Sequence, residues 1–138
     1  MDLNKLMIDY LAEEGFRPHE TPFGIAFKHE GINFLYFKDE EDELYFRLMM
    51  PAIFQVTEDN EEMILKAMNE VNSSIKVIKL YTMDMEDEQG KKDTSVWVAF
   101  EILADSTPEL TDFVPRAISL LKGGRIAFLS KLEEMAEK

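Results

Sequence analysis

The stretch Met68-Asn69-Glu70-Val71-Asn72-Ser73-Ser74-Ile75-Lys76-Val77-Ile78-Lys79-Leu80 joins a helical pattern to a strand pattern. The spacing of apolar residues before and within this stretch indicates one face of a helix, formed by Ile64, Met68, Val71 and Ile75. After it, residues 76–83 are predicted to form a strand. This stretch therefore sets the order of the elements on either side of it.

Two asparagines, Asn69 and Asn72, stand one helical turn apart at this junction. Asparagine tolerates the left-handed backbone that ends helices, and its side chain can bond to loop backbone. We interpret both residues as a structural helix stop and loop clamp. A role in binding a ligand is the alternative.

Upstream, the pattern predicts one helix and three strands. Apolar residues at helical spacing begin the chain, and three strands follow over residues 23–28, 32–38 and 44–50, with residues 52–56 able to extend the last one beyond Pro51. Short connections between these strands favour an antiparallel meander. The predicted helix carries Leu3, Leu6, Met7, Tyr10 and Leu11.

Downstream, residues 84–94 read as a long loop and residues 95–103 as a fifth strand. Pro108 opens a long helical region in which one apolar phase continues past Pro115 and Gly123-Gly124, which predicts one helix with a possible bend. The order is α-β-β-β-α-β-β-α. It predicts a single α+β domain over residues 1–138, a two-layer sandwich with a five-stranded antiparallel sheet.

Composition limits the function. The 138 residues are 46% apolar and contain no cysteine, which excludes disulfides and thiolate chemistry. The net charge of −13 argues against nucleic acid and against anionic membrane surfaces as partners, and it favours basic ones. No apolar run of signal-peptide length follows the first residues, so we expect a cytoplasmic protein.

The predicted sheet is apolar on both faces, although a sheet with one solvated face usually alternates apolar and polar residues. One face would pack under the helices. The other needs a cover, either from the C-terminal helix or residues 52–56 of the same chain or from a second protein chain. This second face would carry Leu35, Phe37, Tyr45, Met49 and Trp97, which we predict to be the partner or dimer face.

No motif for catalysis, a metal or a cofactor is recognisable. His19 and His29 lack a second ligand at metal spacing, and we interpret them as surface histidines. The acidic runs at residues 39–43 and 84–88 lack the spacing of a calcium loop. Gly123-Gly124-Arg125 is not a phosphate loop. We therefore expect no catalytic residues, no metal and no cofactor, and we expect that the protein is not an enzyme.

The element order, together with a second helix ending in Asn69-Glu-Val-Asn72 and a strand beginning at Lys76-Val77, resembles the bacterial YbjN-like proteins. More distantly, it resembles the class I type III secretion chaperones. The fifth strand and long last helix also fit, whereas Pro115 and Gly123-Gly124 depart from the pattern. The resemblance implies a two-layer α+β fold and homodimers. It also implies either binding of extended partner segments or a regulatory, stress-related role, without catalysis.

These observations favour a non-enzymatic protein-binding or regulatory module, a homodimer that uses the apolar sheet face. The alternative is a small-ligand sensor with a pocket between the sheet and the C-terminal helix, where Gly123-Gly124 would act as the hinge.

Overall fold

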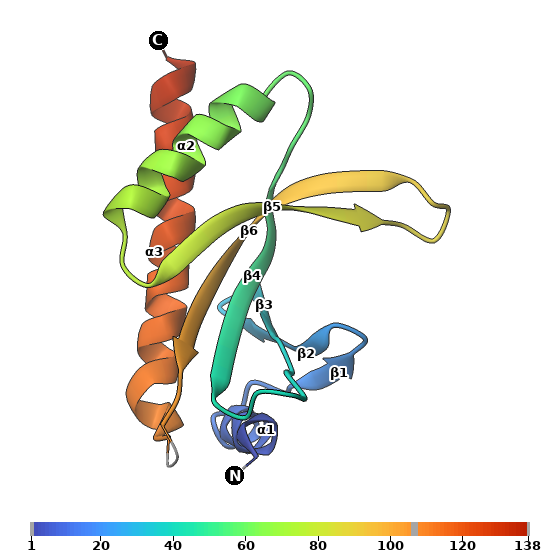
Figure 1. Cartoon of the computed structure of the whole chain (residues 1–138), viewed down its shortest axis with the longest axis vertical. Coiled ribbons are helices and arrows are strands. Elements are labelled where there is room, and N and C mark those ends of the chain that lie inside the picture. Colours follow the sequence, from blue (N-terminus) through green and yellow to red (C-terminus); the bar gives the residue numbers. More distant parts are fainter. Residues whose placement is uncertain (1, 106–107, 138) are drawn as a thin grey trace.

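The computed structural model describes residues 2–105 and 108–137. These residues form three helices and one sheet, whose arrangement can be followed in Figure 1. In chain order the elements are α1 (Leu3–Glu13), β1 (His19–Thr21), β2 (Gly24–His29), β3 (Ile32–Tyr36), β4 (Tyr45–Gln55), α2 (Glu61–Ser74), β5 (Ile78–Glu86), β6 (Lys92–Leu103) and α3 (Leu110–Ala136). The α+β class predicted from the sequence is confirmed.

The sheet has six strands in the order β1-β2-β3-β4-β6-β5, and every neighbouring pair is antiparallel. The prediction of five strands was wrong by one. The additional strand, β1, has only three residues, His-Glu-Thr, and Pro18 and Pro22 flank it. A strand this short and polar shows no alternation, so the sequence carries no signal for it.

The β2–β3 hairpin forms because Glu30 and Gly31 both adopt positive φ, at 52° and 78°. Two such residues in a two-residue loop match the right-handed twist of the flanking strands. The next hairpin strand, β4, continues through Pro51, where a register shift against β6 lies between Met50 and Phe54. A bulge is one of the few places where a sheet accommodates proline.

One continuous helix, α3, runs along the sheet past both Pro115 and the glycine pair (Figure 1). Gly124 is buried, and a Cβ at this position would collide with the side chain of Ile78 on β5. Gly123, in contrast, has open space around it. Gly124 therefore allows α3 to pack closely on the sheet, which gives this departure from the expected pattern a structural reason.

The helices cover one face of the sheet, which we call the covered face. The buried residues of all three helices belong to one cluster with those of the covered face, and this cluster forms the main core. Its fully buried sheet residues include Phe34, Tyr36, Phe46, Leu48 and Val98. A second, smaller cluster of Leu35, Met49, Trp97 and Ala99 lies on the opposite face, the open face.

Candidate functional site

The open face brings together the residues that the sequence predicted for a contact surface. Leu35 pairs with Met49, and Met49 pairs with Ala99, so one row of side chains crosses three adjacent strands. Of the predicted residues, Leu35, Met49 and Trp97 are buried, with 7%, 4% and 6% of their surface exposed. Phe37 is 38% exposed and Tyr45 is half-buried.

The buried part of the open face is covered by side chains of the sheet itself. Tyr81, Met83 and Met85, all on β5, pack against Trp97 and its neighbours, with Ala26 from β2. The C-terminal helix lies on the covered face, and residues 52–55 belong to β4, so neither supplies this cover. Residues 84–94 were predicted to form a loop, whereas β5 extends to Glu86 and β6 begins at Lys92, so the prediction missed Met85.

A groove of about 370 Å³ remains beside this cluster. Leu35, Met49 and Trp97 line it together with Phe37, and Met83 and Met85 complete its apolar wall. Its charged lining residues are Lys38, Glu40 and Arg47. Tyr45, the fifth predicted residue, is not part of the lining but lies next to Arg47.

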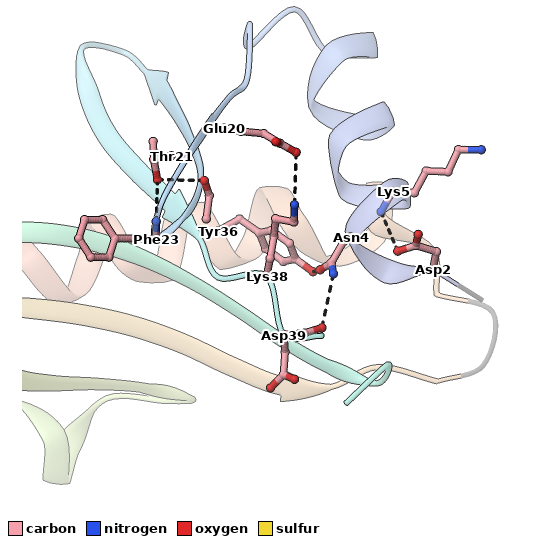
Figure 2. A network of polar contacts seen from close by, with 10 residues as sticks. Asp2, Asn4, Lys5, Glu20, Thr21, Phe23, Tyr36, Lys38 and Asp39 are labelled. Atoms are coloured by element: carbon pink, nitrogen blue, oxygen red, sulfur yellow. Dashed lines mark hydrogen bonds and ion pairs between the residues drawn. The ribbon is translucent and has the colours of Figure 1, made fainter. Parts of the chain in front are cut away.

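Phe23 stands at the rim of the groove, 58% exposed. The turn that presents it is held by Thr21, whose hydroxyl accepts from the Phe23 N–H at 3.2 Å and donates to the Gly24 carbonyl at 3.0 Å (Figure 2). Gly24 has φ 144°, and a Cβ there would collide with the Tyr36 carbonyl oxygen. Only glycine fits this close approach, so Gly24 determines the position of the turn that carries Phe23.

The network drawn in Figure 2 anchors the strands that carry this rim to α1. The Tyr36 hydroxyl donates to the Asn4 side chain at 2.9 Å, and the Asn4 amide donates to the Asp39 carbonyl at 3.4 Å. Lys38, which lines the groove, pairs with Glu20 on β1 at 3.2 Å. Burial raises the pKa of Tyr36, so its hydroxyl remains a donor at neutral pH.

A polar cluster centred on Arg47 adjoins the groove on the open face. The guanidinium donates to the Tyr81 hydroxyl at 2.7 Å and to the Tyr45 hydroxyl at 3.5 Å, and it lies 5.4 Å from the centre of the Tyr81 ring. Because β6 separates β4 from β5, Arg47 reaches across a strand to contact Tyr81. Tyr45 donates to Glu101, which also pairs with Lys79.

The electrostatics of this cluster follow from these contacts. Burial and the hydrogen bond to Glu101 raise the pKa of Tyr45. For Glu101, burial alone would raise the pKa, but hydrogen bonds from Lys79 and Tyr45 outweigh it and lower the pKa. Burial alone would lower the pKa of Arg47, yet the Tyr81 and Tyr45 contacts raise it, so Arg47 stays charged.

The two asparagines of the helix–strand junction lie in different surroundings. The side chain of Asn72 bonds twice to Leu80 on β5: its amide donates to the Leu80 carbonyl at 3.1 Å, and its oxygen accepts from the Leu80 N–H at 2.8 Å. It thus occupies part of the edge of β5 as a neighbouring strand would. Asn69 is exposed, and α2 continues past both residues to Ser74.

The histidines lie away from the groove lining. His19 is exposed on β1, and His29 packs against the Phe16 ring at 5.3 Å, with Glu30 at 3.7 Å. Within residues 2–105 and 108–137, no group of three histidine or acidic side chains is arranged to hold a metal ion. None of the helices described there is long and apolar enough to span a bilayer.

No family model and no curated protein matches the sequence. Among solved structures, the crystal structure of YbjN from E. coli superposes with a TM-score of 0.64 over 95% of this chain and 92% of that chain. The chain has a YbjN-like fold. This confirms the resemblance drawn from the element order, and at 12% sequence identity the likeness shows the fold alone. YbjN is described as a candidate transcription regulator.

Proposed function

We propose that this chain is a non-enzymatic protein-binding module that forms a homodimer through the open face of its sheet. The observation that carries the proposal is the position of Phe23. An exposed aromatic side chain stands at the rim of an apolar groove on the same face. Clustered aromatic and methionine residues with an arginine are typical of the centre of protein interfaces.

A dimer with two-fold symmetry uses the same surface patch on both copies. Phe23 of one copy would insert into the groove of the second copy, between Phe37 and Met83, and the reverse contact would form at the same time. A patch that carries both an exposed side chain and a groove to receive it suits this arrangement. It would also bury Phe37, which is 38% exposed in the single chain.

Charge supports the choice of this face. Two copies that each carry a net charge of −13 repel one another over most of their surface. The groove differs, because its charged lining residues are two cations, Lys38 and Arg47, against one carboxylate, Glu40. The groove itself therefore does not add to this repulsion.

The lining also supports a role without catalysis. Its titratable side chains are Lys38, Glu40 and Arg47, and Lys38 is already paired with Glu20. A nucleophile beside an oriented base, the arrangement that acyl transfer requires, is not among the lining residues. If the chain shares a role in transcription with YbjN, its charge favours protein contacts over DNA.

Sedimentation equilibrium over a range of concentrations tests the dimer. We expect wild type to dimerise and Phe23→Ser to remain monomeric, because the substitution removes the inserted side chain. Leu65→Ser, at a position 50% exposed on α2, is the matched control and should dimerise like wild type. A monomeric wild type, or a Phe23→Ser variant that dimerises normally, would refute the proposal.

Trp97 also belongs to the predicted partner face, but a substitution there is unsuitable as a test of the dimer. With 6% of its surface exposed, Trp97 is part of the small core, and a charge at that position would destabilise the fold itself. Phe23 separates loss of association from loss of folding, because more than half of its surface is already in contact with solvent.

A further inference from the structure

The groove also has the size and lining of a small-molecule site. Its volume of about 370 Å³ lies within the range of known ligand pockets, about 300–1,000 Å³. Methionines 49, 83 and 85 supply much of its apolar wall, and methionine side chains adapt readily to flexible ligands. In contrast, at Gly124 the helix α3 packs directly on Ile78 and Val98, which leaves little room for a pocket between helix and sheet at that residue.

One polar group in this groove has capacity for a further partner. Arg47 donates only to the neutral hydroxyls of Tyr45 and Tyr81, and it forms no ion pair with any carboxylate in the described part of the chain. Its Nε is buried and has no hydrogen-bond partner there. The carboxylate that faces it, Glu101, is held by Lys79 and Tyr45.

We propose that the groove binds a small aliphatic carboxylate. Its alkyl chain would lie against Met49, Met83 and Trp97, and its carboxylate would bind the Arg47 guanidinium. Arginine presents its donors in a planar fork that matches a carboxylate. Apolar walls beside an arginine distinguish this ligand class from two others. A neutral hydrocarbon would gain nothing from Arg47, and a hydrophilic anion would gain nothing from the methionines.

This inference uses the groove of the proposed dimer but does not depend on the dimer. Where the dimer forms, the ligand and Phe23 of the second copy compete for the same space, so binding would favour the monomer by mass action. Where it does not form, the groove of the single chain is still available. Ligand binding and dimerisation are measured separately, so either can fail alone.

Trp97 provides the measurement, because it is the single tryptophan of the chain and lines the groove. Decanoate, below its micelle concentration, is titrated into wild type, Arg47→Met and Lys28→Met while the tryptophan emission is followed. We expect saturable binding to wild type and at least about tenfold weaker binding to Arg47→Met, from the loss of a charge-assisted hydrogen bond. Lys28→Met removes the same charge from the same face of the sheet, but Lys28 is exposed and is not among the residues that line the groove, so binding should remain within about twofold.

Decan-1-ol has the same chain without the charge and serves as the second control. It should bind wild type and Arg47→Met alike, and more weakly than decanoate binds wild type. The inference is overturned if decanoate causes no saturable change, if decanol binds wild type as tightly, or if Arg47→Met retains full affinity. If Arg47→Met does not fold, Arg47→Gln, which keeps donors toward the tyrosine hydroxyls, takes its place.

Discussion

The two faces of this sheet bury apolar residues by different means. On the covered face, Phe46 and Phe100 pack beneath helices, and the aromatic ring of Phe113 from α3 meets Phe46 edge-on at 5.0 Å. On the open face, Trp97 is almost as well buried, yet its cover comes from neighbouring strands. Side chains from neighbouring strands cover this face only in part, and the groove lies beside the residues that they cover. Side-chain burial alone therefore does not distinguish a face covered by helices from a face covered by its own strands.

The largest expected difference in stability is between two substitutions, one of a fully buried aromatic residue on the covered face and one of a partly exposed aromatic residue on the open face. Phe46→Ala should lower the free energy of unfolding by about 3–5 kcal/mol, because the helices cannot close the cavity it leaves. Phe37→Ala, at a position 38% exposed, should cost under about 1 kcal/mol. Urea unfolding of both variants measures the difference, and similar losses would show that the open face is a second full core.

Much of this architecture could be predicted from local patterns. The helix-to-strand junction around Val71 and Ile78, the β2–β3 hairpin and the long C-terminal helix all show periodicity or turn chemistry within a short window. The residues of the open face were also found, because alternation along each strand assigns them to one side. The alternation thus correctly assigned three residues to one face, Leu35, Met49 and Trp97.

What could not be predicted depends on contacts between distant segments. The pairing of β1 with β2 rests on Thr21 and Gly24, which show no pattern of their own. Arg47 lies within the predicted strand over residues 44–50, but its contact with Tyr81 depends on β6 lying between their strands, which only the strand order reveals. Residues 23–28 were predicted to form one strand, whereas Phe23 lies in the turn before β2, at the rim of the groove.

A smaller effect on the free energy of unfolding is expected at β5, the edge strand of the sheet, where the two faces meet. Asn72→Ala should lower the free energy of unfolding by about 1–2 kcal/mol, because it removes both side-chain hydrogen bonds to Leu80. Asn69→Ala, three residues earlier in the same helix and exposed, is the matched control and should change stability by less than about 0.5 kcal/mol. Thermal unfolding of the pair measures this contrast, and equal losses would mean that Asn72 does not act through β5.

The smallest effect on stability concerns the polar cluster around Arg47 on the open face. The pKa of Glu101 is lowered below the ordinary value of 4.5 by Lys79 and Tyr45, against the opposing effect of burial. A lowered pKa in the folded state adds stability that is present above that ordinary value and is lost as the pH falls through the folded-state value.

Glu101→Gln keeps an acceptor for Tyr45 but removes the ion pair with Lys79. The variant should therefore be less stable than wild type at neutral pH by about 0.5–1 kcal/mol, and this difference should vanish in acid. Urea unfolding of both proteins from neutral to acidic pH measures it, and a stability difference that stays constant with pH would show that the Glu101 carboxylate is not stabilised by its partners in the folded protein.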